Sequence, residues 1–353
     1  MGRRDESFVK PWQSVAECAG QEARLKQRIG YCTTSDGVRI AFSVMGKGPP
    51  IIRTSHWMTH VEHDLDSLIL RHVLLYLALH HELISFDARG EGMSQRDIET
   101  LSFDDWLADL DAVVEASGHE RFTLFGASQG AATAVAYAVK HPERVNHLIL
   151  YGGFANNRLR WDNKEALDLA RGLIRQGWGS KQDAYRQWFT SRFLPEGSAD
   201  QFRYFNKMQR MSASPEIAEK HLMAAATIDV TPLLPKVQAP TLVLHCTGDI
   251  VASVECGREM AAGIPGARFV PLPGKNHMLL AGSPAHRIFA DAIAEFLGDP
   301  PPPRTLPGTR NLQEHASAMV GAVEGNWAIK LVLLAGAVIG LVLSLSQLTG
   351  IFG

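Results

Sequence analysis

The segment Phe122–Tyr137 constrains the fold of this chain more than any other stretch. Its sequence, FTLFGASQGAATAVAY, starts as a short apolar run, breaks at Gly126-Ala127-Ser128-Gln129-Gly130 and continues as an alanine-rich segment of high helix propensity. This pattern predicts a strand, a sharp turn and a helix. In such a turn the serine is held in a strained conformation that exposes its hydroxyl, and glycines let strand and helix approach closely. Ser128 is therefore a candidate nucleophile, beside a helix N-terminus that favours developing negative charge.

On both sides of this segment, strands and helices are predicted to alternate. A hairpin over 27–45, with Asp36-Gly37 at its turn, comes first. Ser102 is predicted to cap a helix that ends at Gly118. Repeated alternation predicts a mostly parallel sheet with helices on both faces. The other predicted strands are 51–54, 81–87, 145–151, 241–247 and 268–272, and the other predicted helices include 68–80, 253–262 and 284–297.

The alternation stops after Gly152-Gly153. Residues 154–235 are predicted to form a helical cap, rich in aromatic side chains, over the carboxyl ends of the strands. Most of these side chains are expected to pack the cap onto the sheet domain. Some should line an apolar pocket, and the candidates are Trp161, Trp188 and Phe189.

An aspartate and a histidine follow two of the later predicted strands. Asp249 lies in a Thr-Gly-Asp turn after the strand at 241–247, and His277 lies in a loop after the strand at 268–272. A nucleophilic serine needs a base to take its proton, and the base needs a carboxylate to orient it. In an open α/β sheet these groups follow later strands in the order nucleophile, acid, base. Ser128, Asp249 and His277 therefore form a candidate catalytic triad.

Five motifs between about Arg28 and Leu297 resemble those of the α/β-hydrolase superfamily. They are GASQG at 126–130, DARGEGMS at 87–94, HPERVNHLILYGG at 141–153, TLVLHCTGD at 241–249 and LPGKNHMLL at 272–280. The chain is similar in particular to hydrolase modules of the serine esterase type that accompany bacterial signalling domains, although the sequence shows no such partner domain. The resemblance implies an α/β-hydrolase domain over 27–298, with Ser128 as nucleophile, Asp249 as acid and His277 as general base.

The resemblance also implies an oxyanion hole made of two backbone N–H groups. One belongs to Gln129, the residue after the nucleophile. The other comes from the loop after strand 51–54, where the family usually has His-Gly followed by a bulky residue and this chain has Ser55-His56-Trp57. Trp57 is therefore the expected donor, with His56 in place of the glycine. Loss of one such donor typically costs about 3 to 4 kcal/mol of transition-state stabilisation.

Four potential metal ligands, His56, His60, His63 and Asp64, crowd into nine residues. Their spacing matches no strong zinc pattern, and His56 and His60 are expected instead to contact substrate or to pack beside the pocket. No metal and no cofactor are expected. The formal charge of -2 and the pI near 6.7 give no basic surface for nucleic acid.

The two ends of the chain differ in character. Residues 1–26 are polar and predict a loose arm or a short helix without a secretory signal, and the scattered cysteines indicate reduced thiols. Residues 299–326 predict a Pro-rich linker. Within the predicted transmembrane helix 327–350, the 22 residues from Trp327 to Leu348 carry only Lys330 as a charge, and at about 1.5 Å per residue they are long enough to cross a bilayer. The flanking charges predict a single-pass protein with a cytoplasmic catalytic domain.

Together these features predict a membrane-anchored serine hydrolase that cleaves a hydrophobic ester through Ser128. A second hypothesis is a hydrolase-fold sensor that binds a small molecule with little or no catalysis, which His56 at the expected glycine position would favour. A third is C–C hydrolase or cofactor-free haloperoxidase chemistry, which uses the same triad.

Overall fold

The computed structural model describes residues 26–156 and 164–306, all within the first of the two units into which the chain divides, Met1–Gly308. The predicted arm up to residue 25, the linker beyond residue 306, the predicted transmembrane helix 327–350 and Trp161 lie outside the described residues. Of the helices inside the described ranges, none combines the length and the apolar composition that crossing a bilayer requires.

The described residues form an eight-stranded sheet in the order β1-β2-β4-β3-β5-β6-β7-β8. Strand β2 is antiparallel to both its neighbours, and β3 to β8 are mutually parallel. The mostly parallel sheet predicted from the alternation of elements is confirmed, because parallel strands need the helical crossovers that the sequence pattern indicated. The strands are β1 Arg28–Thr33, β2 Arg39–Gly46, β3 Pro50–Arg53, β4 Glu82–Phe86, β5 Phe122–Ala127, β6 Val145–Tyr151, β7 Thr241–Cys246 and β8 Arg268–Leu272.

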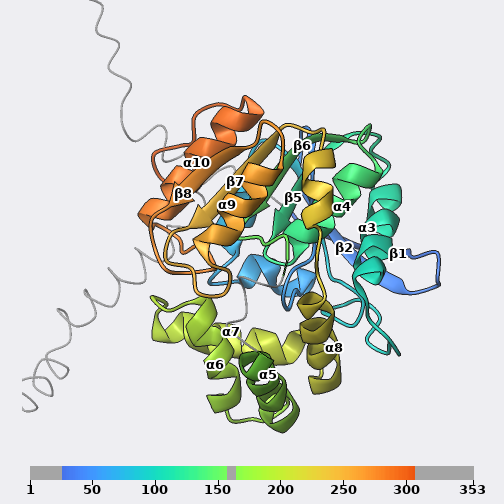
Figure 1. The fold of residues 1–353 in the computed structure, drawn as a ribbon, viewed down its shortest axis with the longest axis vertical. Helices are drawn as coiled ribbons and strands as arrows, with labels where there is room; N and C mark the ends of the chain where they lie inside the picture. Colours follow the sequence, from blue (N-terminus) through green and yellow to red (C-terminus); the bar gives the residue numbers. More distant parts are fainter. Residues whose placement is uncertain (1–25, 157–163, 307–353) are drawn as a thin grey trace, which may run out of the picture. The chain divides into compact units, whose positions relative to one another are not determined.

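Helices cover both faces of the sheet (Figure 1). On one face α3 (Phe103–Ser117), α4 (Gly130–Lys140) and α9 (Val254–Gly263) share an apolar core with the strands. On the other face α2 (Arg71–Leu77) and α10 (Pro284–Leu297) form a separate core. The buried side chains of both cores keep the strand ends at fixed positions beneath the loops that carry the candidate site.

Helix α2 is shorter than its predicted range of 68–80. The Ser67 hydroxyl accepts hydrogen bonds from the N–H groups of Ile69 and Leu70, at 3.3 and 3.0 Å. This local turn competes with the helix, which begins only at Arg71. A short 3-10 helix, η1 (Val61–Asp66), precedes it.

The part of the cap that the structure describes consists of four helices, α5 (Lys164–Gly177), α6 (Ala184–Phe193), α7 (Ala199–Ser212) and α8 (Pro215–Ala226). They lie together on one side of the sheet domain (Figure 1), and the 3-10 helix η2 (Thr231–Lys236) leads back to the sheet. A third apolar core, which includes Trp178 and Phe205 of the cap, also contains Trp57 and Met58 from the sheet domain. The helical insertion predicted from residues 154–235 is therefore present.

Candidate active site

Ser128 occupies the sharp turn between β5 and α4. Its φ of +54° lies in the left-handed region, which is rare for a residue other than glycine. The Ser128 N–H donates to the Tyr151 carbonyl oxygen at 2.9 Å, which ties the turn to the end of β6. A Cβ on Gly130 would lie 2.3 Å from both Ser55 O and Thr54 Oγ1. Only glycine therefore lets α4 start so close to the loop after β3, as the sequence pattern predicted.

Two hydrogen bonds join Ser128, His277 and Asp249 in a continuous line. The Ser128 Oγ is 2.9 Å from His277 Nε2, and His277 Nδ1 is 2.6 Å from Asp249 Oδ2. The three side chains come from the loops after β5, β8 and β7 and are almost completely buried, with exposed fractions of 7%, 2% and 5% for Ser128, His277 and Asp249. Charge that develops here during a reaction is shielded from water, so fixed dipoles act on it strongly.

Backbone and side-chain bonds hold both partners of Ser128 in place. Asp249 Oδ1 accepts from the N–H groups of Val251 and Ala252, at 2.8 and 3.2 Å, which leaves Oδ2 for His277. The Tyr151 hydroxyl donates to the His277 carbonyl oxygen at 2.9 Å. Sequence reasoning did not single out Tyr151, although its position at the end of β6, next to the Gly152-Gly153 break, was visible in the sequence.

The cap also contacts the loop that carries His277. The carbonyl oxygen of Phe193, at the end of α6, accepts from the N–H groups of His277 and Met278 at 3.0 and 3.2 Å. The Phe193 ring packs edge-on against the His277 ring, with 5.2 Å between centroids. The sequence showed Phe193 only as one of many cap aromatics, so its position beside His277 could not be predicted.

Trp57 and Gln129, the two expected oxyanion donors, follow β3 and Ser128 respectively. Among the described residues, neither backbone N–H has a hydrogen-bond acceptor. Met58, directly after Trp57, has φ +58° and is, with Ser128, one of the two non-glycine residues at positive φ in the described ranges. Backbone strain therefore occurs on both sides of the candidate site.

His56 turns its ring toward its own loop. His56 Nε2 is 2.9 Å from Arg53 Nη1, and Nδ1 is 3.2 Å from the Trp57 carbonyl oxygen. An arginine can only donate, so Nε2 is the acceptor and Nδ1–H donates to Trp57. Burial, followed by the charge of Arg53, lowers the pKa of His56 to about 3, which keeps the ring neutral. Asp64 completes the group by pairing with Arg53 Nη2 at 3.1 Å.

An inner cavity lies beside Ser128 and His277. Its walls are mostly apolar and include Ile69, Val73, Leu74, Phe125 and Phe289, together with His56 and Trp57. It leaves about 40 Å³ for the centres of water-sized molecules. This space holds a few waters.

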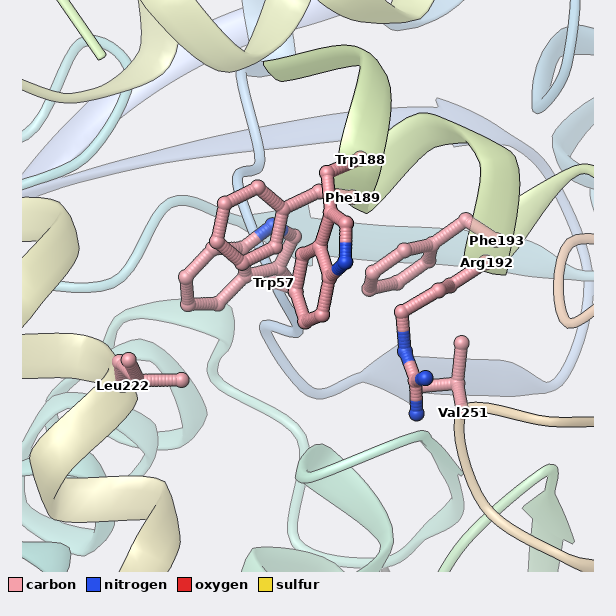
Figure 2. A pocket seen from close by; sticks show the side chains of 7 residues that line it. All are labelled: Trp57, Trp188, Phe189, Arg192, Phe193, Leu222 and Val251. Atoms are coloured by element: carbon pink, nitrogen blue, oxygen red, sulfur yellow. The ribbon is translucent and has the colours of Figure 1, made fainter. Parts of the chain in front are cut away.

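A smaller outer cavity lies on the cap side of Trp57. Figure 2 shows the rings of Trp57, Trp188 and Phe193 gathered around it, with Leu222 on the opposite side. Phe189, Arg192 and Val251 complete its lining. Trp57 and Phe193 line both cavities. Of the predicted pocket residues, Trp188 and Phe189 line the outer cavity and His56 lines the inner one.

His60 lines neither of these two cavities. Its ring packs on that of His63, with 4.4 Å between centroids. Potential ligand atoms of His60, Glu62 and His63 lie within 4.8 Å of one another, so three side chains of η1 and its N-cap could approach one metal ion. The sequence had grouped His60 and His63 instead with His56 and Asp64, whose side chains the structure directs to Arg53.

Comparisons with known proteins agree with this geometry. A family model described as alpha/beta hydrolase fold matches residues 59–284. The bifunctional esterase/perhydrolase DCH of Acinetobacter calcoaceticus is 25% identical over 268 residues, which are 70% of this chain and 93% of that protein. The AB hydrolase superfamily protein YisY of Bacillus subtilis (strain 168) is 26% identical over 261 residues, 70% of this chain and 91% of YisY. The crystal structure of a hydrolase from Pseudomonas aeruginosa PA01 is similar in fold, with a TM-score of 0.64 and 23% identity over 77% of this chain and 98% of that one.

Proposed function

The chain belongs to the α/β-hydrolase fold family, and from that premise we propose that it is a serine hydrolase that cleaves carboxylic esters. The observation that supports this proposal is the continuous hydrogen-bonded line from Asp249 through His277 to Ser128. His277 is placed to take the Ser128 proton while the hydroxyl oxygen attacks the ester carbonyl.

The remaining steps follow from the same groups. As the tetrahedral intermediate forms, its oxyanion accepts from the N–H groups of Trp57 and Gln129. His277 then returns the proton to the leaving alcohol, and the acyl group stays on Ser128. Water enters, gives its proton to His277 and attacks the acyl-enzyme. His277 then passes this proton to the Ser128 oxygen as the acyl bond breaks and the acid leaves. Asp249 orients the ring throughout and stabilises its protonated form.

The lining of the cavities supports a hydrophobic ester as substrate. Apolar side chains surround the inner cavity on the side of Val73, Leu74 and Phe289, which suits a compact apolar acyl group. The relative from Acinetobacter calcoaceticus is described as an esterase and perhydrolase. Hydrolysis of an ester is the transfer of its acyl group to water, which is the reaction proposed here.

Labelling with a fluorophosphonate probe, followed by turnover of esters of graded chain length, tests the proposal. The wild-type chain is expected to be labelled and to be active, and Ser128→Ala should lose labelling and about 10⁴- to 10⁶-fold in kcat. Ser191→Ala, which changes an exposed serine of the cap helix α6, is the matched control and should keep both.

Two outcomes would contradict this function. A folded wild-type protein that binds small apolar molecules but is never labelled would be the sensor of the second hypothesis. A labelled protein that turns over no ester, but acts on a carbon–carbon bond or on hydrogen peroxide, would carry the alternative triad chemistries instead.

We further propose that residues 327–348 attach this domain to a membrane, with the domain on the cytoplasmic side. The support is the sequence alone, in which about twelve Leu, Ile and Val side chains contribute roughly -5 kcal/mol of insertion free energy.

The full chain should stay with membranes after a high-salt wash. Two central arginines, Ala337→Arg and Val338→Arg, cost about 2.5 to 3.5 kcal/mol each and should release it. Equal membrane retention of both proteins would refute the anchor.

A further inference from the structure

Glu91 is a fully buried carboxyl group that the mechanism above does not use. It follows β4 in the turn 87–94, and none of its side chain is exposed. Its Oε1 accepts from Met58 N at 3.3 Å, and its Oε2 accepts from Thr59 N at 3.0 Å. The Thr59 hydroxyl donates a third bond to Oε2 at 3.1 Å. One side chain thus fixes the two peptide groups that follow Trp57.

The loop that Glu91 fixes is strained. Met58 stands at φ +58°, and a left-handed conformation costs a non-glycine residue about 1 to 2 kcal/mol. Such a conformation persists only where its surroundings impose it. Trp57 is bonded directly to the first of the two fixed peptide groups, so a rotation there would turn the Trp57 N–H away from the position proposed for the oxyanion.

Glu91 also faces the cap. His221, on α8, has its Nδ1 3.3 Å from Glu91 Oε1, and both side chains are completely buried. His221 Nε2 lies 3.1 Å from the Arg89 carbonyl oxygen, to which it donates. Nδ1 then carries no proton, and it lies against Glu91 Oε1 without a hydrogen bond.

The charge state of the pair agrees with this arrangement. Burial raises the pKa of Glu91 to about 7 and lowers the pKa of His221 to about 4. A protonated Glu91 beside a neutral imidazole leaves no buried charge at this contact. The charge of Arg96, on the same loop, acts in the opposite direction and favours the ionised carboxylate.

We propose that Glu91 is a positioning residue for the oxyanion hole, which it holds in shape through its hydrogen bonds with Met58 and Thr59, at a point where it also lies against His221 of the cap helix α8. This inference rests on the serine hydrolase function proposed above.

The test compares Glu91→Met with Glu91→Gln. Methionine has a similar volume and packs without a buried charge, so the protein should fold, but it cannot accept from the N–H groups of Met58 and Thr59. For Glu91→Met, kcat per fluorophosphonate-titrated serine should fall about 10- to 100-fold, because the oxyanion forms only in the transition state. KM should change by less than about 3-fold, and inhibition by phenylboronic acid, which forms a tetrahedral serine adduct, should weaken by the same factor as kcat.

Glu91→Gln, whose amide oxygen still accepts from Thr59, should recover part of the lost kcat. Asp109→Asn is the matched control, since Asp109 is equally buried but pairs with Arg89 and should affect stability without changing kcat per titrated serine. A folded Glu91→Met protein with kcat within about 2-fold of wild type would overturn the inference.

If Glu91→Met fails to fold, Thr59→Val removes one of the three bonds and leaves Glu91 in place. It should lower kcat by about 3- to 10-fold at unchanged KM, and an unchanged kcat would overturn the inference in the same way. Failure of the proposed function is distinguishable, because it would appear as a wild-type protein that is neither labelled nor active.

Discussion

At the scale of single residues, His56 shows how a departure from a family pattern can be accommodated. The sequence suggested that a histidine at the expected glycine position would disturb the oxyanion hole. The structure places its ring against Arg53 and the Trp57 carbonyl oxygen, where it supports the loop that carries the expected donor. The substitution of glycine therefore comes with a buried partner that glycine would lack.

We predict that His56→Ala destabilises the protein by about 1 to 3 kcal/mol, because Arg53 Nη1 loses a buried acceptor. Equilibrium unfolding in urea measures this loss. His119→Ala is the control, because His119 forms a half-exposed pair with Glu82 at 3.0 Å and should cost no more than about 1 kcal/mol. Equal losses for the two variants would show that the contact with Arg53 contributes nothing.

The proximity of Ser128, Asp249 and His277 could be anticipated from the sequence because each follows a recognisable strand. The contacts of Glu91 could not. Its partners Thr59 and Met58 lie 32 and 33 residues away in the chain, and a carboxyl group in a glycine-rich turn has the same local sequence whether it is exposed or buried. Only the fold reveals that both loops meet at one point.

At the scale of elements, the sequence predicted the features that depend on neighbouring residues, such as helix ends. Ser102 and Asp105 form the capping box of α3, and Gly118 ends that helix at φ +71°, as residue preferences at helix ends imply. The start of α2 was missed because the side chain of Ser67 competes with the helix. The cap was predicted as a helical insertion, but the order of its aromatic contacts depends on tertiary packing that periodicity does not encode.

Arg186 illustrates this dependence within the cap. It is fully buried on α6 and donates from Nε to Asn206 O at 3.1 Å and from Nη1 to Ser180 O at 2.8 Å. Its Nη2 also pairs with Asp183 at 2.7 Å. A charged residue at a helical position would be assigned to the surface from sequence alone, yet here it connects α6 with α7 and with the turn after α5.

At the scale of the whole molecule, several histidines of the described residues are buried or half-buried in the neutral form. Burial lowers the pKa of each below its ordinary value, so these groups bind protons in the unfolded chain at a pH where the folded chain does not. Their contribution to stability is complete above about pH 6.5 and is lost as the pH falls toward 4. The groups are His56 and His72, with a pKa of about 3, His60, His221 and His286, with a pKa of about 4, and His147 and His245, whose pKa values are also lowered.

Buried carboxyl groups oppose this trend. Burial raises the pKa of Asp87, Glu91 and Asp109 to about 7, and it also raises the pKa of Asp64. These groups bind protons in the folded state first, which stabilises it as the pH falls from 7 to about 4. The histidines outnumber them, so the net effect between pH 6.5 and 5 is a loss of stability.

We predict that the free energy of unfolding falls by about 1 to 3 kcal/mol per pH unit over this window, as measured by urea unfolding at several pH values. His286→Leu removes one of these titrating groups and should reduce the slope by about 1.4 kcal/mol per pH unit. A free energy of unfolding that stays level or rises as the pH is lowered from 6.5 to 5 would contradict the expectation.

The bond between the cap and the histidine loop has a consequence for the range of substrates. The Phe193 carbonyl oxygen holds the backbone at His277 and Met278. A displacement of α6 that makes room for a larger substrate would therefore also weaken the hold on His277, the general base. Bulky esters would then reach a less well aligned serine, so turnover should decline with acyl size before binding does. Selectivity among esters would then appear in kcat, because it depends on how far α6 is displaced and not on the volume of the inner cavity.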